Sequence, residues 1–348
     1  MAVDEAKLEQ FMGQVVSDWA ATAGSALAFI GDRLRLYRAL ARIQPATPAE
    51  LAGETGTSER YVREWLLCQA AGGYVTYADG RFGMTEEQAA ALADPDSPVS
   101  MLGGFQITNA VFADLGHVLE RFRSGDGMGW GEHHHDLFEG TERLFAPGYR
   151  RDLVPSWLPA LDGVVRKLEA GARVADVGCG HGISTLVMAE AYPASSFVGY
   201  DAHDGSVRTA RARAEAAGIG NAAFETAGAT EYDGGEFDLV CFFDALHDMG
   251  DPAAAVRHAR GALAPGGTIM AVEPFAGDRP EDNFNPVGRL FYAASTMVCV
   301  PNSLAAEGVA LGAQAGTERT RQVFEEAGCA SFRRAAETPF NLVFEARG

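Results

Sequence analysis

Apolar positions in the second half of the chain form short runs that alternate with helix-like segments. Apolar runs bounded by turn residues predict buried strands, and the longer segments between them predict helices. The expected strands are 173–177, 197–201, a short one around Phe224, 237–243 and 268–273. The expected helices between them are 206–217 and 251–263. Because strands that alternate with helices at this spacing build parallel sheets, we predict an α/β fold with a Rossmann-like, doubly wound, mostly parallel sheet.

The first half of the chain has a different pattern, in which two short helices precede a small hairpin. Helices are expected at 47–56 and 58–71, and a hairpin at 74–85 turns at Asp79-Gly80. This order of elements is typical of a winged helix. Upstream, 11–40 has the spacing of two amphipathic helices, whose apolar residues either pack inside the domain or form a dimer interface.

These patterns divide the chain into parts with different organisation. We expect a helical and winged-helix domain over 1–100, a helical connector over 101–168 and the sheet domain over 169–348. An insertion at about 278–316 follows the last expected strand and lies where it can cover the strand ends as a lid. A length of 348 residues and an apolar fraction of 47% agree with two domains.

Composition narrows the class of protein further. No apolar run approaches the length of a membrane span, so no membrane partner is expected. Asp4, Glu5 and Glu9 stand where a signal peptide would be basic, which favours a cytoplasmic location. The five cysteines form no CxxC pair and suit reduced thiols in the core better than disulfides or structural zinc.

A winged helix suggests DNA binding, but the charge of this one opposes it. Between residues 45 and 100, nine acidic residues stand against three basic ones, and the whole chain carries a net charge of −19. Such a surface repels phosphates. We therefore expect no nucleic-acid partner.

The most informative motif is VADVGCGHGIST, over residues 174–185. Gly178, Gly180 and Gly182 place a glycine-rich turn between an expected strand and an expected helix, so that the backbone can approach a ligand closely. Ser184 and Thr185 suit a helix start. Ile183 occupies the place of the third glycine of a dinucleotide fingerprint, which makes NAD a poor fit.

With Asp176 before the glycines and Asp201 at the end of the next strand, this segment resembles motif I and the following acidic position of class I S-adenosylmethionine-dependent methyltransferases. The resemblance implies S-adenosylmethionine as cofactor and S-adenosylhomocysteine as product. The cofactor residues that it implies are Asp176, Gly178, Cys179, Gly180, Gly182, Asp201, Ala202, Gly228, Ala229, Thr230, Phe243 and Asp244. Among them, Asp201 would accept hydrogen bonds from the ribose hydroxyls, and residues 228–230 would border the adenine.

A winged helix in front of such a domain is similar to the small-molecule O-methyltransferases of secondary metabolism. In that family the winged helix forms a dimer interface and helps to wall the substrate pocket, which implies a homodimer with a small-molecule substrate. The segment 243–248 resembles the family's His-Asp segment, in which the histidine deprotonates a substrate hydroxyl. His247 is the corresponding candidate base, and Glu273 resembles the acidic residue that orients it.

Methyl transfer to a hydroxyl needs a base, which favours His247 independently of the resemblance. A hydroxyl becomes a competent nucleophile as its proton leaves, and a neutral imidazole near pH 7 can accept that proton. The alternative is that His247 only shapes the pocket, and that Glu273 only holds the following loop.

Candidate substrate residues lie outside these motifs. They are polar or aromatic residues of the connector and of the lid insertion: Trp130, His134, Tyr149, Asn285, Arg289, Tyr292 and Asn302. Packing between helices or domains is the alternative for each of them. Three adjacent histidines at 133–135 are not expected to bind a metal, because neighbouring side chains point in different directions.

The sequence thus predicts an enzyme that transfers a methyl group from S-adenosylmethionine to a small molecule, at a hydroxyl oxygen. Two alternatives stay open. The first is transfer to nitrogen, carbon or sulfur on the same fold, for which His247 is dispensable. The second is a regulator that binds S-adenosylmethionine and a DNA site or protein partner without turnover.

Overall fold

The structure, a computed structural model, describes residues 3–233 and 235–348. The chain forms two compact units. The first consists of Met1–Phe112 with Glu139–Pro147, and the second of Ala113–Phe138 with Gly148–Gly348. The predicted connector, 101–168, is thereby divided between the two units.

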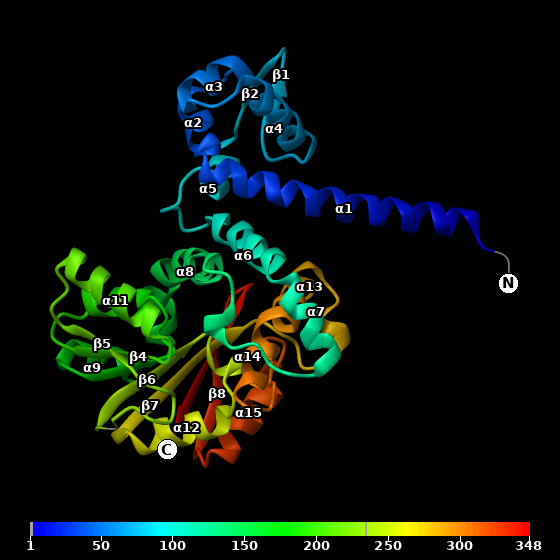
Figure 1. Cartoon of the computed structure of the whole chain (residues 1–348). Coiled ribbons are helices and arrows are strands. Elements are labelled where there is room, and N and C mark those ends of the chain that lie inside the picture. The colour runs from blue at the N-terminus through cyan, green and yellow to red at the C-terminus, as the bar shows by residue number, and fades with distance from the viewer. Residues whose placement is uncertain (1–2, 234) are drawn as a thin grey trace. The chain divides into compact units, whose positions relative to one another are not determined.

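The first unit is helical and carries one small hairpin (Figure 1). Its helices are α1 (Glu5–Arg33), α2 (Leu36–Ile43), α3 (Pro48–Thr55), α4 (Glu59–Ala71), α5 (Glu86–Leu92) and α6 (Leu102–Ala113), while α8 (Asp136–Gly148) contributes its larger part. The hairpin pairs β1 (Thr76–Ala78) with β2 (Arg81–Gly83). The predicted winged-helix elements are therefore present.

Local signals explain where these helices begin and end. Thr47 and Thr85 each form a capping box with the residue three positions on, which satisfies free N–H groups at the starts of α3 and α5. Arg35 adopts a left-handed conformation, with φ of 58°, and separates α1 from α2. Leu40, Leu66 and their apolar neighbours then form a buried core.

The second unit is built on a seven-stranded sheet. Its strands are β3 (Arg173–Val177), β4 (Ser196–Asp201), β5 (Ala222–Thr226), β6 (Phe237–Phe243), β7 (Leu263–Pro274), β8 (Ser331–Glu337) and β9 (Asn341–Arg347). Their order is β5-β4-β3-β6-β7-β9-β8. The first five are parallel, whereas β9 pairs antiparallel with both β7 and β8. The mostly parallel doubly wound fold is confirmed.

Most helices of this unit flank the sheet, and those after β3 connect its strands (Figure 1). They are α7 (Leu115–Ser124), α9 (Val164–Ala170), α10 (Ile183–Ala191), α11 (Asp204–Ala217), α12 (Pro252–Gly261), α13 (Pro286–Ala294), α14 (Val300–Ala305) and α15 (Gly316–Glu326). Wider π-helical turns span Tyr149–Trp157 and Ser295–Cys299, and short 3-10 turns span Trp130–Glu132, Leu158–Ala160, Leu246–Asp248 and Pro280–Asn283. In the described residues, no helix has the length and hydrophobicity needed to cross a membrane.

Two features of the sheet differ from the sequence expectation. The strand expected from residue 268 begins at Leu263, because Phe237 pairs with Leu263 and the register then jumps to Leu239 opposite Thr268. The residues between Leu263 and Thr268 are accommodated as an irregularity inside β7. Strands β8 and β9 were not predicted, although β9 lies between two neighbours and is almost fully buried.

Candidate active site

The glycine-rich loop turns the chain from β3 into α10. Gly178, Gly180 and Gly182 all have positive φ, at 76°, 53° and 79°. A Cβ on Gly182 would lie 2.6 Å from the ring of Phe224, so this glycine is required by packing. A Cβ on Gly180 would meet nothing within 4 Å. The backbone at Gly180 is therefore open to the close approach of a ligand.

Two carboxylates flank this loop. Asp176 is fully buried, and its Oδ2 accepts hydrogen bonds from the hydroxyls of Ser184 and Thr185, both at 2.6 Å. Its Oδ1 has no hydrogen-bond partner within the described residues. Burial raises the pKa of Asp176 to about 6. Ser184 and Thr185 thus lie in the first turn of α10, as expected, but their hydroxyls hold Asp176 instead of capping the helix.

Asp201 ends β4 and reaches back to the glycine loop. Its Oδ2 accepts from the backbone N–H of Gly180 and its Oδ1 from that of His203, both at 2.8 Å. Burial raises its pKa, while these two hydrogen bonds act in the opposite direction. The carboxylate is therefore fixed beside the open backbone of Gly180.

His247 and Glu273 form a buried pair at the ends of β6 and β7. The imidazole Nδ1 lies 2.6 Å from Glu273 Oε2, and Glu273 Oε1 accepts from the backbone N–H of Leu246 at 3.1 Å. Burial lowers the pKa of His247, but the Glu273 carboxylate and the neighbouring Cys299 thiol outweigh it and raise the pKa well above 6.5. Glu273 is thus placed to orient the imidazole and to stabilise its charged form.

Further buried carboxyl groups surround this pair. Asp244 has a φ of 50°, which is uncommon for a residue with a side chain. Its two oxygens accept from the hydroxyl of Tyr149 and the amide Nδ2 of Asn341, both at 2.8 Å. Burial, reinforced by Glu273, raises the pKa of Asp244 to about 7, and burial does the same for Asp248. The surroundings of His247 are therefore rich in carboxyl groups, which burial keeps partly protonated near pH 7.

The other predicted cofactor residues lie at the same edge of the sheet. Ala202 follows β4, residues 228–230 follow β5, and Phe243 ends β6. In parallel sheets, ligands bind beyond the carboxyl ends of the strands, where all of these residues stand. Cys179 differs, because it is buried beside Phe224 as a core residue, and it would contribute its backbone and not its thiol.

The predicted substrate residues do not all lie together. Asn302 accepts from the backbone N–H of Trp130 at 2.8 Å and donates to the carbonyl of Asp248 at 3.1 Å, and Tyr149 binds Asp244. These three residues therefore lie close to the surroundings of His247. The residues on α13 are used differently: Asn285 caps the helix by accepting from Gly288, while Arg289 and Tyr292 are exposed on the same helix. His134 belongs to a separate cluster, described below.

The sequence did not indicate the residues that support Asp244 and His247. Asn341 opens an unpredicted strand, and Cys299 lies in the lid insertion, far from His247 in sequence. Neither position carries a spacing signal that would link it to the site. For Ser184 and Thr185, in contrast, the positions eight and nine residues after Asp176 were visible in the motif itself.

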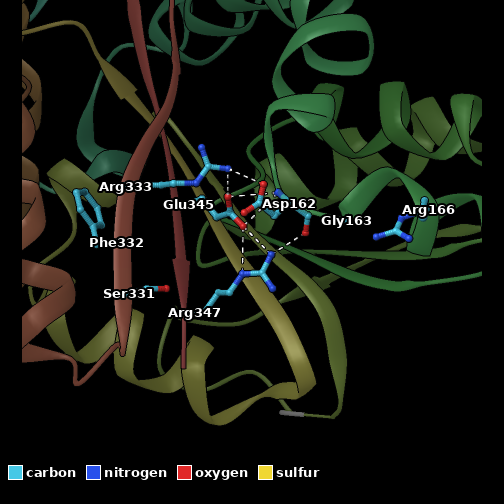
Figure 2. Close-up of a pocket in the computed structure, with 8 residues that line it drawn as sticks. All are labelled: Asp162, Gly163, Arg166, Ser331, Phe332, Arg333, Glu345 and Arg347. Atoms are coloured by element: carbon cyan, nitrogen blue, oxygen red, sulfur yellow. Dashed lines mark hydrogen bonds and ion pairs between the residues drawn. The ribbon is translucent and has the colours of Figure 1, made fainter.

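A pocket of this unit lies away from His247, at the other end of the sheet (Figure 2). It has a volume of about 580 Å³, and its lining residues are Asp162, Gly163, Arg166, Ser331, Phe332, Arg333, Glu345 and Arg347. Because β9 pairs Asn341 with Pro274 and Ala346 with Ile269, Glu345 is at the end of the sheet opposite Glu273. Figure 2 shows Arg333 and Arg347 directed at the buried carboxylate of Glu345, and both pair with it. The charges of the two arginines are thus neutralised within the fold. Because the pocket lies at the other end of the sheet, its residues cannot act together with His247.

Family comparisons agree with this geometry. Residues 168–328 match the model of a methyltransferase domain, and residues 22–94 match that of an Rv2258c-like winged helix-turn-helix domain. The chain carries a methyltransferase domain behind a winged-helix domain. The order and nature of the two domains confirm the prediction from the sequence.

Curated methyltransferases match part of the chain. A 27-O-demethylrifamycin SV methyltransferase of Amycolatopsis mediterranei is 32% identical over 146 residues, which cover 40% of this chain and 50% of that protein. A ubiquinone biosynthesis O-methyltransferase of Ruegeria pomeroyi is 34% identical over 99 residues, or 28% and 39% of the two chains. The chain thus matches half or less of the length of these relatives.

Solved structures match the fold over nearly the whole chain. Human N-acetylserotonin methyltransferase, in complex with S-adenosylmethionine, has a TM-score of 0.71 at 19% identity and covers 99% of this chain and 98% of its own. An O-methyltransferase family protein from Burkholderia thailandensis has a TM-score of 0.67 at 18% identity, with coverage of 100% and 99%. At these identities the likeness shows the fold, and no more.

Proposed function

We propose that the protein transfers the methyl group of S-adenosylmethionine to a hydroxyl oxygen of a small molecule. The observation that carries the proposal is the buried His247–Glu273 pair, which lies at the same sheet edge as the open glycine loop. The methyltransferases among the relatives and structural neighbours support the reaction class.

The loop residues fit this cofactor. Gly180 leaves room at the backbone, Asp201 offers a carboxylate to the ribose hydroxyls, and the buried Oδ1 of Asp176 has a free acceptor position. When bound, S-adenosylmethionine supplies an electrophilic methyl group on a cationic sulfur. Ionised carboxyl groups favour a cation over the neutral product. Asp176, Asp201, Asp244 and Asp248 can supply them, and a bound cation would in turn favour their ionised forms.

The role of His247 follows from its partner. With Glu273 accepting from Nδ1, the second ring nitrogen, Nε2, remains to take the proton of an acceptor hydroxyl. Glu273 holds the ring in this tautomer and stabilises the imidazolium that forms. Tyr149 and Asn341, through Asp244, hold the turn between β6 and His247 in place.

A screen for product formation tests the reaction. The protein is incubated with S-adenosylmethionine and a panel of hydroxylated aromatic and aliphatic compounds, and S-adenosylhomocysteine is measured by mass spectrometry. Release of S-adenosylhomocysteine with a hydroxyl compound, and not with its methyl ether, supports the proposal. Product only from amines, thiols or carbon acids would replace it with the alternative acceptor atoms.

The rate should depend on pH in a defined direction. Because Glu273 and Cys299 raise the pKa of His247 well above 6.5, the neutral imidazole that accepts a proton becomes abundant only as pH rises beyond that value. We expect kcat/KM for an acceptor from the screen to rise on the alkaline side of pH 6.5. An initial-rate profile from pH 5.5 to 9.5 measures this, and a flat profile would contradict a titrating base.

We further propose that the protein forms a homodimer through α1. The N-terminal part of this helix exposes an apolar stripe at helical spacing: Leu8, Phe11, Met12, Val15, Val16 and Trp19. Trp19 is 73% exposed and Phe11 60%. Figure 1 shows α1 extending beyond the other helices of its unit. Contiguous exposed apolar surface of this kind marks a protein interface, and the small-molecule O-methyltransferases that the chain resembles support a second copy as the occupant.

Light scattering after gel filtration should therefore report a dimer of the full chain. Phe11→Glu with Val15→Glu should give a monomer, because each charge would be buried in the interface. Lys7→Glu, an exposed change outside the stripe, is the control.

The same samples should show no salt-sensitive binding of duplex DNA, since the winged-helix region is acidic. A monomeric wild type would refute the dimer, and DNA binding that weakens steeply with salt would favour the regulator alternative.

A further inference from the structure

The histidine-rich segment before α8 is held in one conformation by Asp114. The carboxylate Oδ2 of Asp114 accepts from Nδ1 of His133 and from the backbone N–H of His134, both at 3.0 Å. The side chain of His133 is buried, with 1% of its surface exposed. Because His133 points inward, the following side chains are directed elsewhere.

The next three side chains place their ligand atoms together. Imidazole nitrogens of His134 and His135 and the carboxylate of Asp136 lie within 4.8 Å of one another. His134 Nδ1 is 3.7 Å from Asp136 Oδ2, and His135 Nε2 is 4.0 Å from Asp136 Oδ1. The two rings lie 4.2 Å apart. Of the three adjacent histidines, His133 thus binds Asp114, whereas His134 and His135 place their nitrogens together beside Asp136.

We propose that His134, His135 and Asp136 bind one divalent transition-metal ion. Two imidazoles and one carboxylate are a typical three-ligand set for zinc, which leaves further positions for water. Tetrahedral ligands at about 2.0–2.1 Å from zinc lie roughly 3.3 Å apart, so the atoms here need to approach by about 0.5–1.5 Å. His135 can supply this movement, because its side chain is 77% exposed.

Charge and burial suit a cation at this place. Only 5% of the Asp136 side chain is exposed, so its charge is poorly screened by water. The N-terminus of α8 disfavours a cation, but Asp136 is the first residue of that helix and offsets this effect. Imidazole ligands select zinc, cobalt or nickel over magnesium and calcium, which prefer oxygen.

The ion would stabilise the segment that leads to Phe138. The ring of Phe138 lies 5.0 Å from that of His203, and the backbone of His203 donates to Asp201. A metal ion here would therefore stabilise one side of the candidate cofactor site, and it would not need to contact the reacting groups. This inference does not depend on the proposed methyl transfer.

Metal titration of the full-length protein, purified without a histidine tag and freed of metal by chelation, tests the proposal. Cobalt(II) is followed by visible absorption and zinc(II) by calorimetry, with magnesium(II) as the comparison ion. We expect one equivalent of cobalt or zinc and no response to magnesium. His134→Ala and His135→Ala should each weaken binding at least about tenfold, since even loss of a group that only supports a ligand has an effect of that size.

The control is His117→Ala, which removes an exposed histidine of α7 and should leave the affinity unchanged. His135 is exposed, so His135→Ala should leave the fold intact. This variant therefore tests the site even if His134→Ala unfolds the segment. Absence of a cobalt or zinc equivalent in the wild type would overturn the proposal. Equal affinity in His135→Ala and the wild type would overturn it as well.

Discussion

Replacement of His247 by alanine is expected to lower methyl transfer by roughly 10²–10⁴-fold, because help from a general base is realised only in the transition state. The affinity for S-adenosylmethionine should remain nearly unchanged, since His247 pairs with Glu273 and not with the glycine loop. Single-turnover rates with an acceptor from the screen measure the first quantity, and calorimetry the second. The variant should also lose the alkaline limb of the pH profile.

Two further variants make this result specific. Glu273→Gln keeps an acceptor oxygen for Nδ1 and should therefore cost less than loss of His247. His117→Ala removes an exposed histidine and should have no effect on the rate. If His247→Ala keeps near-normal turnover, His247 is a wall of the pocket, and the acceptor is an already nucleophilic nitrogen, carbon or sulfur.

The second large effect concerns the cofactor loop. Gly180→Val should weaken S-adenosylmethionine binding, because the side chain would enter the open space beside the backbone. Its φ of 53° adds roughly 1–2 kcal/mol of strain to the fold. Asp201→Ala should weaken binding by about 1.5–3 kcal/mol, the value of a hydrogen bond to a charged group. Calorimetric titration with S-adenosylmethionine measures both losses.

Gly220→Val is the matched control for the glycine substitution. A Cβ at Gly220 also meets nothing within 4 Å, and its φ is not positive, but it lies outside the loop. This variant should bind the cofactor like the wild type. Unchanged affinity in both Gly180→Val and Asp201→Ala would show that the cofactor does not bind at this loop.

The sequence predicted the parallel part of the sheet well because its signals are local. Strands β3 and β6 have the predicted limits, since each is a mostly apolar segment with turn residues close to its ends. Strand β9 was not predicted. Glu345 interrupts its apolar run, and only the tertiary pairing with Arg333 and Arg347 allows this carboxylate to be buried there.

The candidate site was predictable as far as it follows from topology. Parallel strands place Asp176, Asp201, His247 and Glu273 at one edge, whatever their neighbours are. Contacts between distant segments leave no such signal, as Tyr149 and Asn341 on Asp244 show. The lid residues Asn285, Arg289 and Tyr292 were predicted to bind substrate from their polarity. A helix cap also needs a polar side chain, and this is the role of Asn285.

A crystal structure of the full chain with S-adenosylhomocysteine tests the central claim most directly, because it locates the cofactor relative to His247. We predict that the ribose hydroxyls contact Asp201, that the backbone of Gly180 touches the ligand, and that the sulfur faces His247 and Glu273. S-adenosylhomocysteine bound elsewhere on the chain, or no bound ligand at saturating concentration, would contradict the account.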